Sequence, residues 1–399
     1  MSSSNGNGSG NGRGGSRSRE AVILGGWRTP FGKRGGCFSN WHPVEMLSFT
    51  LKALIERTGV DAAEVDDVIG GCVGQVGEQA LNVSRFAWLD AGLPESTPAT
   101  TVDRQCGSGL QAIQFAAQGV MAGGYDLVVA CGVENMSRVP IGSQVTADRT
   151  PMTASVRERY GVDEFSQSVG AEMVARKWGL DRAALDDYSA RSHARAANAT
   201  TRGWLAEEIV PVPLEGNLIQ ADQGIRPDTS VEKLATLKPA YPGLELLTAG
   251  NSSQLTDGAS AMLIASRDKA DELSLRPRAR LVQFSQVGSD PVMMLTGPIP
   301  ATRKVLQRAG LAIDDIDVFE VNEAFAPVPL AWQEELGVGA DRLNVNGGAI
   351  ALGHPLGASG TRLIITALNE LERRGGRYAL AAICEGGGMA NAAIIERLD

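Results

Sequence analysis

The chain has 399 residues, of which 43% are hydrophobic and 21% are charged, and its formal net charge is -9. This balance is typical of a soluble globular protein with a large core. The acidic charge, with no dense Lys/Arg run, excludes a nucleic-acid-binding or membrane-surface protein. The five cysteines are odd in number and lack CxxC spacing. We therefore expect free thiols, no metal site and a cytoplasmic location.

The first 18 residues are almost entirely Ser, Gly, Asn and Arg, without an apolar run that would form a signal peptide. We expect a disordered tail there. No later stretch approaches the ~20 apolar residues of a membrane span. Beyond the tail, short β-rich runs alternate with helical ones, and strands are expected at 21–25, 68–72, 127–132, 318–321 and 379–384. The alternation predicts an α/β fold with a mostly parallel sheet.

Cys106 lies where an extended run gives way to a helical run at 111–121, and Gly107 and Gly109 follow it closely. A thiol on the first turn of a helix faces unpaired backbone N–H groups, which favour the thiolate. The two glycines allow another backbone or a substrate to approach. For an isolated cysteine, the alternative is an inert residue of the core.

The sequence repeats itself. In the first half, Cys106 precedes a helical run and then a strand that ends near Cys131; in the second half, Ser359 precedes a helical run and a strand that ends at Cys384. Both pairs are separated by 25 residues. We infer two similar α/β halves, 19–274 and 275–399. Residues 133–250 have no counterpart in the second half and are expected to form an inserted loop subdomain, with amphipathic stretches at 168–178 and 185–203.

Four side chains follow predicted strands or a glycine-rich loop, and ligands of open α/β sheets bind at such places. His354 lies in a loop with five glycines in fifteen residues, Cys384 precedes three consecutive glycines, and Asn322 follows the strand at 318–321. We expect these three to meet Cys106 at one cavity. The alternatives are a solvated loop histidine, a buried strand-end cysteine beside a plain turn and a helix-capping asparagine.

The sequence resembles the thiolase family of acyl-CoA acyltransferases. Four blocks carry the resemblance: Asp-Arg-Gln-Cys-Gly-Ser-Gly-Leu at 103–110, Asn-Glu-Ala-Phe at 322–325, the glycine-rich block at 346–360, and Cys-Glu-Gly-Gly-Gly at 384–388. They stand in the family's order and span the chain from about residue 20 to its end. The resemblance implies the duplicated α-β-α-β-α fold and a homodimer or homotetramer.

The resemblance also implies roles for individual residues. Cys106 is expected to be the nucleophile that carries the acyl group, His354 its base, and Cys384 the acid and base at the α-carbon. Asn322 would hold a water in one oxyanion hole, and the N–H groups of Cys106 and Gly386 would form a second. Coenzyme A would be a substrate, with no permanently bound cofactor, and the positions matched to its binding are Arg226, Ala249, Ser253, Ala324 and Phe325.

One departure bears on the substrate. Ser166 and Gln167 stand where short-chain acetoacetyl-CoA thiolases have a His-Met pair, and the segment 165–178 is more similar to the degradative branch. We therefore expect cleavage of a longer or bulkier 3-oxoacyl-CoA. A biosynthetic acetoacetyl-CoA thiolase, a decarboxylating ketosynthase, a catalytically silent binding protein and a redox or metal-binding thiol protein are the alternatives.

Overall fold

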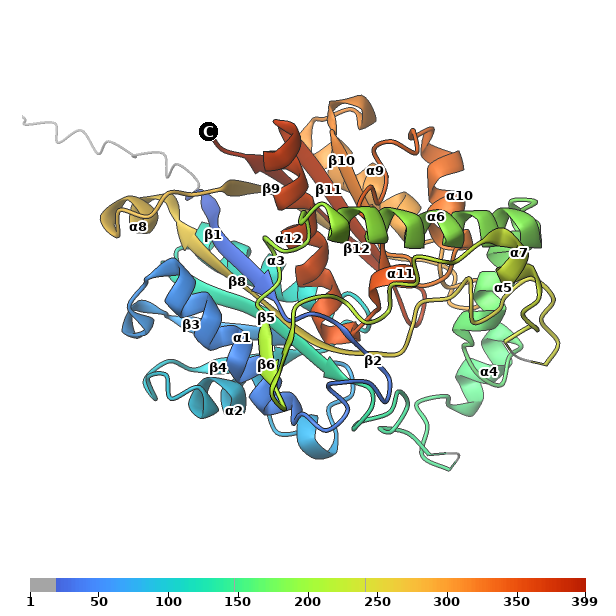
Figure 1. Cartoon of the computed structure of the whole chain (residues 1–399), viewed down its shortest axis with the longest axis horizontal. Helices are drawn as coiled ribbons and strands as arrows, with labels where there is room; N and C mark the ends of the chain where they lie inside the picture. The colour runs from blue at the N-terminus through green and yellow to red at the C-terminus, as the bar shows by residue number, and fades with distance from the viewer. Residues whose placement is uncertain (1–18, 147, 241) are drawn as a thin grey trace, which may run out of the picture.

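The computed structural model describes residues 19–146, 148–240 and 242–399, so the predicted tail at 1–18 lies outside the described residues. In this part of the chain a ten-stranded sheet forms the frame of the molecule (Figure 1). Its strands are β1 (Ala21–Arg28), β2 (Gly32–Lys33), β3 (Asp67–Gly71), β4 (Ala99–Val102), β5 (Leu127–Asn135), β8 (Thr256–Ser266), β9 (Ala279–Gly288), β10 (Val318–Val321), β11 (Tyr378–Glu385) and β12 (Met389–Arg397). The five strands expected from the sequence are all present.

The strand order repeats between the two halves, which confirms the predicted duplication. The first half contains the order β3-β5-β8-β1, and the second contains β10-β11-β12-β9. In each half, the first two strands of this order pair parallel to each other (β3–β5 and β10–β11). The two following pairs are antiparallel: β5–β8 and β8–β1 in the first half, and β11–β12 and β12–β9 in the second. The halves join where β1 pairs antiparallel with β9, and β4 is an additional strand at one edge.

The prediction of a mostly parallel sheet is wrong. Only the pairs β3–β4, β3–β5 and β10–β11 are parallel among the described strands. Parallel neighbours need a crossover, usually a helix. Here β11 instead turns directly into β12 through Gly386, Gly387 and Gly388, so these two strands run antiparallel.

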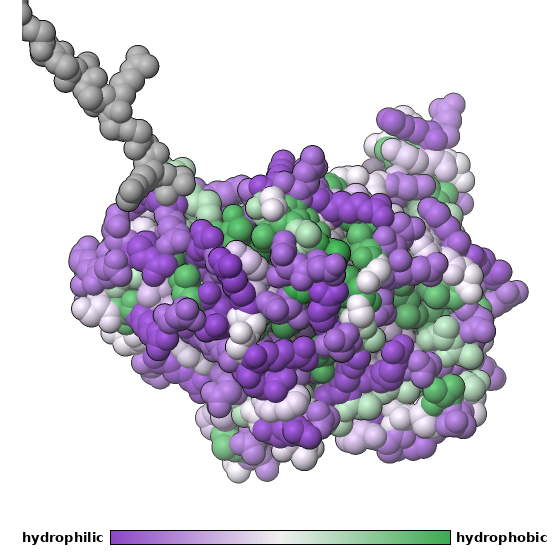
Figure 2. All heavy atoms as spheres, turned by 90° about the horizontal axis from the view of Figure 1, so that it is seen from above, coloured by the Kyte–Doolittle hydropathy of each residue, from purple (hydrophilic) through white to green (hydrophobic). Residues whose placement is uncertain are grey.

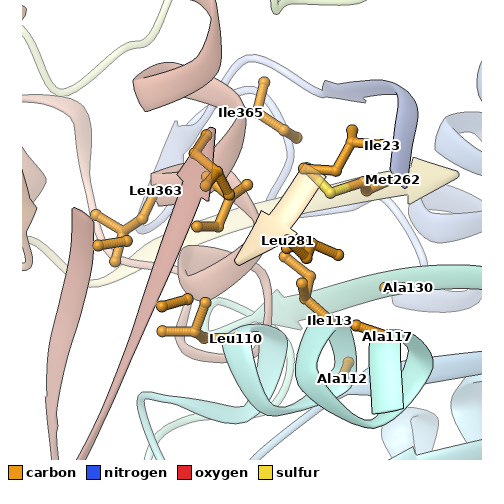
Figure 3. Close-up of a cluster of buried hydrophobic side chains, with 14 of the residues drawn as sticks. Ile23, Leu110, Ala112, Ile113, Ala117, Ala130, Met262, Leu281, Leu363 and Ile365 are labelled. Carbon is orange, nitrogen blue, oxygen red and sulfur yellow. The ribbon is translucent and has the colours of Figure 1, made fainter. Parts of the chain in front are cut away.

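Helices divide the molecule into five layers. Helices α3 (Ser108–Ala122) and α12 (Leu356–Arg374) pack between the two half-sheets, where their apolar side chains meet those of β1, β5, β8, β9 and β11. Figure 3 shows this central cluster, with Leu110 and Ile113 from α3 near Leu363 and Ile365 from α12. The outer layers are α1 (Pro43–Thr58) and α2 (Val83–Asp90) on the first half-sheet, and α9 (Pro298–Ala309) and α10 (Pro327–Leu336) on the second.

The inserted subdomain separates β5 from β8. It contains α4 (Ala154–Tyr160), α5 (Gln167–Lys177), α6 (Arg182–Thr201), β6 (Val212–Leu214), β7 (Asn217–Ile219) and α7 (Val231–Ala235). In Figure 1, α4, α5 and α7 gather at one side of the molecule. The remaining helices are α8 (Arg267–Glu272) and α11 (Ala349–Leu352), the second of which immediately precedes His354.

A buried ion cluster fastens the insert to the sheet. Arg28, at the end of β1, is 0% exposed and donates to Glu208 at 2.8 Å and to Asp222 at 2.6 Å. Removing one partner of such a buried cluster costs about 3–5 kcal/mol, because a charge is left uncompensated.

The outer surface of the molecule is mainly polar. The face in Figure 2 is mainly hydrophilic, with hydrophobic side chains in patches between the polar ones.

Candidate active site

Cys106 lies in the short connection between β4 and α3. Its neighbour Gln105 has a φ of 50°, and Gly107 is the N-cap of the helix, so Cys106 precedes the first turn of α3. The side chain is 4% exposed. The backbone N–H groups of Cys106 itself and of Gly386 both lower the pKa of its thiol. These are the two groups that the sequence assigned to one oxyanion hole.

The protonation state of Cys106 differs from the sequence-based expectation. Burial, followed by the negative charge of Glu385, raises the pKa of the Cys106 thiol to about 12, and the two N–H groups offset only part of this. A thiol with this pKa is neutral at pH 7, which disagrees with the thiolate expected from the helix start. The reason is that the sulfur is enclosed by packed side chains, which penalises the charged form more than nearby dipoles stabilise it.

His354 lies between α11 and α12, and hydrogen bonds fix both its backbone and its ring. Its N–H donates to Thr256 Oγ1 at 3.0 Å, and its Nδ1 lies 2.5 Å from Ser359 Oγ. The Ser359 hydroxyl donates to the Pro355 carbonyl, so it accepts from a protonated Nδ1. This arrangement leaves Nε2 as the ring acceptor, which is the form required of a base.

His354 is also neutral at rest. Burial, with a smaller effect of Arg362, lowers the pKa of His354 to about 3. A proton taken from a thiol by this imidazole is therefore held only while a nearby negative charge, such as an oxyanion or a thiolate, stabilises the imidazolium. Such a pair transfers its proton together with nucleophilic attack rather than before it.

Asn322 follows β10 and contacts the working face of the imidazole. Its Nδ2 lies 3.2 Å from His354 Nε2, and it is 1% exposed. Its Oδ1 has no hydrogen-bond partner among the described residues. A buried amide oxygen without a donor is a suitable acceptor for a water or a ligand hydrogen.

Cys384 ends β11 beside Cys106. It is 1% exposed, and burial, followed by the charges of Cys106 and Glu385, raises its pKa well above the usual range. The segments that carry the two sulfurs are in contact, because a Cβ on Gly107 would meet Glu385 and one on Gly386 would meet Gln105. The helices bring His354 to the same region, because Leu356 packs in the same cluster as Cys106 and Gly357 contacts Gly109.

A cavity of about 1150 Å³ opens beside this cluster, and His354 forms part of its wall. All five positions matched to coenzyme A line it: Arg226, Ala249, Ser253, Ala324 and Phe325. Cys106 and Cys384 are not among its lining residues, so the two sulfurs lie behind the cavity wall. The wall also carries Lys33, Arg34, Ser166 and Gln167, together with the apolar residues Met136 and Leu356.

The sequence did not identify several residues that support this site. Thr256 and Ser359 hold His354, and Glu134 accepts N–H groups of Val73, Gly74 and Gly357, which ties β5 to the start of α12. Ser359 stands five residues after His354 in the glycine-rich block, and this spacing was the available signal. Thr256 lies 98 residues from His354, and Glu134 lies at least 60 residues from each of its partners, where no local pattern points to them.

Among the described residues, no cluster of three His, Cys, Asp or Glu side chains is arranged to hold a metal ion. None of the described helices combines the length and hydrophobicity that a bilayer crossing requires.

Comparison with known proteins identifies the family. Residues 21–268 match the family described as "Thiolase, N-terminal domain", and residues 275–397 match "Thiolase, C-terminal domain". The chain is 50% identical over 386 residues to the steroid 3-ketoacyl-CoA thiolase FadA6 of Mycobacterium tuberculosis, covering 95% of this chain and 94% of that protein. It is 45% identical over 405 residues to the 3-oxoadipyl-CoA/3-oxo-5,6-dehydrosuberyl-CoA thiolase of Escherichia coli, covering 95% and 100% of the two chains.

Solved structures agree with these matches. Human mitochondrial 3-ketoacyl-CoA thiolase is similar with a TM-score of 0.87 and 36% identity, covering 96% of this chain and 99% of that one. The same human enzyme in complex with CoA gives a TM-score of 0.87 and 36% identity, covering 95% and 98%. Since the family matches cover nearly all of the described residues, the chain belongs to the thiolase family and is an acyltransferase.

Proposed function

We propose that this thiolase cleaves 3-oxoacyl-CoA thioesters by thiolysis, with Cys106 as the nucleophile. The observation that carries the proposal is the contact between the segments of Gly386 and Cys106: a Cβ on Gly386 would lie 2.9 Å from Gln105 Oε1. The backbone N–H groups of Gly386 and Cys106 both lower the pKa of the Cys106 sulfur. Such a pair stabilises an oxyanion that forms on a carbon bonded to that sulfur. A protein that only binds acyl-CoA has no need of this arrangement.

In the first half-reaction, His354 Nε2 accepts the Cys106 proton as the sulfur attacks the 3-oxo carbon. The bond between C2 and C3 then breaks, and its electron pair passes to C2 as the enolate of acetyl-CoA. Asn322, through a water, and the protonated His354 stabilise the enolate oxygen, each donor contributing about 3 kcal/mol. Cys384 gives its proton to C2, and acetyl-CoA leaves an acyl group on Cys106.

In the second half-reaction, the Cys384 thiolate accepts the proton of an incoming CoA thiol. The CoA sulfur attacks the acyl carbon, the oxygen becomes an oxyanion between the N–H groups of Cys106 and Gly386, and Cys106 is expelled. Cys106 then recovers its proton from His354. Dividing the transfer in this way gives ping-pong kinetics without a metal or redox group.

Coenzyme A enters along the wall formed by Arg226, Ala249, Ser253, Ala324 and Phe325. The Arg226 guanidinium, exposed at the mouth of the cavity, is the cation for a phosphate of the nucleotide. Ser253 is held by its N–H, which donates to the Ala324 carbonyl at 2.9 Å, so the insert and the second half share this wall.

The acyl group is proposed to be larger than acetoacetyl and to end in a carboxylate. Ser166 and Gln167 line the cavity at the positions where short-chain acetoacetyl-CoA thiolases have a His-Met pair. Lys33 and Arg34 line the cavity, and within the described residues neither pairs with a carboxylate. Relatives named for 3-oxoadipyl-CoA and for a steroid 3-ketoacyl-CoA are consistent with such a substrate.

Thiolysis is proposed to be the main direction, as in the degradative branch. Condensation of two acetyl-CoA molecules to acetoacetyl-CoA uses the same residues in reverse and remains the second candidate. We further propose that the protein is a cytoplasmic homo-oligomer. Within each chain, the two halves meet between residues 274 and 275. The tail at 1–18 is proposed to have no part in the reaction.

The experiment is capture of the acyl-enzyme by mass spectrometry after mixing the protein with acetyl-CoA. The wild-type protein is expected to gain one acetyl group on Cys106. Cys106→Ser is expected to lose this adduct and at least ~10³-fold in turnover, while CoA still binds. Cys384→Ala is expected to keep the adduct but fail to make or break the carbon–carbon bond, because the acid and base at C2 is missing.

Cys37→Ser is the matched control, since Cys37 is a free and only partly buried cysteine in the same chain. It is expected to acetylate and turn over normally. A stable adduct elsewhere, or normal turnover by Cys106→Ser, contradicts the proposed nucleophile. Binding of acyl-CoA without any adduct identifies a silent binding protein instead.

A further inference from the structure

Glu385 is a buried carboxyl group that has no part in the reaction steps above. It is the last residue of β11, directly after Cys384, and is 0% exposed. Neither carboxyl oxygen has a hydrogen-bond donor among the described residues. An ionised carboxylate without donors is strongly destabilised in such surroundings, so the group needs a different explanation.

The neighbours of Glu385 are Gly107 and Asn391. A Cβ atom added to Gly107 would collide with Glu385 Oε1 and lie 2.7 Å from Asn391 Oδ1, so both oxygens press on the residue that follows the nucleophile. Asn391 belongs to β12, where it pairs with Ile383 while Met389 pairs with Glu385. Glu385 and Asn391 are therefore diagonal neighbours on one face of the sheet.

The orientation of the Asn391 amide is fixed by the Gly107 carbonyl. Asn391 Nδ2 donates to Gly107 O at 3.4 Å, and the reversed amide would set two acceptors against each other there. Asn391 Oδ1 and Glu385 Oε1 both lie close to the Cβ position of Gly107, and neither has a donor among the described residues. Two neighbouring buried acceptors without a donor are costly, and one added proton removes the conflict.

We propose that Glu385 is a neutral carboxylic acid that donates its proton to Asn391 Oδ1 and, through Asn391 and Gly107, positions Cys106 and its N–H group. Glu385 is thus a positioning residue rather than a catalytic one. The inference goes beyond the proposed function, because it concerns the resting state of the enzyme and needs no substrate.

The charges around Glu385 agree with this assignment. Burial raises the pKa of Glu385 to about 9, with Arg104 lowering it and Asp103 raising it by smaller amounts. The charge of Glu385 raises the pKa of Cys106 more than the charge of Glu134 does, and it also raises the pKa of Cys384. A neutral Glu385 does not repel the negative charge that forms at Cys106. An ionised Glu385 would destabilise both the Cys106 thiolate and the oxyanion.

The test compares Glu385→Gln, which is neutral and nearly isosteric, with wild-type protein in the rate of Cys106 alkylation by iodoacetamide. At neutral pH the two rates are expected to agree within ~2-fold, because no charge is removed. As pH rises through about 9, Glu385 ionises in the wild type and suppresses the Cys106 thiolate. Glu385→Gln is then expected to react faster, by up to ~10-fold.

A faster reaction of Glu385→Gln already at neutral pH would mean that Glu385 is ionised in the resting enzyme and would overturn the proposal. Identical profiles at every pH would mean that Glu385 stays neutral throughout and would support it. Glu56→Gln, with the same charge change on the exposed face of α1, is the matched control and is expected to follow the wild type. These rates are measured without acyl-CoA, so their outcome is independent of whether the enzyme carries out thiolysis.

Positioning is tested by a second variant. Glu385→Ala removes the contact with Asn391 and Gly107 and is expected to lower kcat ~10-fold or more while the KM for CoA stays unchanged. Glu385→Gln is expected to retain most of kcat, because its amide donates to Asn391 Oδ1 as the acid does. An unchanged kcat in Glu385→Ala, or an equal decrease of kcat in Glu385→Ala and Glu385→Gln, contradicts the proposed role. The infrared band of a protonated carboxyl group, present in the wild type and absent from Glu385→Gln, gives a reading that does not depend on activity.

Discussion

The proposed nucleophile and its proposed base are two neutral groups rather than an ion pair. The pKa of Cys106 is raised to about 12 and that of His354 is lowered to about 3, in both cases chiefly by burial. A resting thiolate–imidazolium pair is therefore disfavoured on both sides. The oxyanion groups come into use only when substrate supplies the carbon that accepts the electron pair, so their stabilisation acts on the transition state rather than on the free enzyme.

The two cations of the cavity wall give a test of the acyl group. Lys33 pairs in register with Thr256, whose hydroxyl accepts the His354 N–H, so Lys33 lies on the catalytic side of the cavity. When 3-oxoadipyl-CoA is the substrate, the double variant Lys33→Ala/Arg34→Ala is expected to raise KM by ~10-fold or more, since it loses contacts to a carboxylate. When an equally long chain that ends in a methyl group is the substrate, KM is expected to change by less than ~2-fold, in steady-state thiolysis assays.

Lys52→Ala is the control for this pair, because Lys52 is exposed on α1 and away from the cavity lining. An equal rise in KM with both substrates would indicate that Lys33 and Arg34 bind the phosphates of CoA instead. Better turnover of the uncharged chain by the wild-type enzyme would also contradict a carboxylate-ended substrate.

At the scale of elements, the contact between α3 and α12 sets the positions of Cys106 and His354. Both helices begin at the active site, and they meet through glycines: a Cβ on Gly360 would collide with the Leu110 backbone N–H, and one on Gly357 with the carbonyls of Gly71 and Val133. These atoms belong to backbone, which cannot move aside as a flexible side chain does. The helices are thus held at a separation that only glycine permits.

Gly360→Ala is expected to lower the free energy of unfolding by about 1–3 kcal/mol or more, because an overpacked backbone contact must separate the helices. Turnover of the protein that still folds is expected to fall as well, since both helix starts move. Denaturant unfolding and steady-state rates give these two values. Gly288→Ala is the control, because a Cβ there has no atom within 4 Å; similar effects of the two changes would contradict this account of the contact.

At the scale of the whole molecule, one edge of the sheet is open, and we propose it as the contact with a second copy of the chain. Strand β4 pairs with β3 on one side and with no described strand on the other. Large apolar side chains are exposed on the neighbouring elements: Leu81 (83%), Phe86 (49%), Leu89 (39%) and Phe115 (41%). An open edge beside exposed hydrophobic groups is the arrangement expected of an interface.

We expect light scattering of the wild-type protein to give at least twice the chain mass of 41.9 kDa. Phe86→Asp/Leu89→Asp is expected to give the single-chain mass, because a buried unpaired carboxylate opposes association. Leu218→Asp, a similar change at a residue of β7 that is 59% exposed, is expected to leave the mass unchanged. A monomeric wild type, or an unchanged mass for the double variant, would rule out an interface at this edge.

The sequence by itself determined the duplicated halves, the five principal strands and the four blocks that carry Cys106, Asn322, His354 and Cys384. These features are local: hydrophobic runs, glycines and fixed spacings act within a few tens of residues. Ser359 was within reach of the same reasoning, since it lies in the block of its partner.

Only the tertiary structure decided the direction of the strands, the proton positions and the surroundings of Glu385. The strand directions depend on how distant segments pair across the sheet. The neutral state of Cys106 follows from burial by residues of α3, α12 and β11, and no local pattern reports the dielectric surroundings of a side chain. Glu385, Asn391 and Gly107 come from two parts of the chain more than two hundred residues apart, and folding alone makes them neighbours.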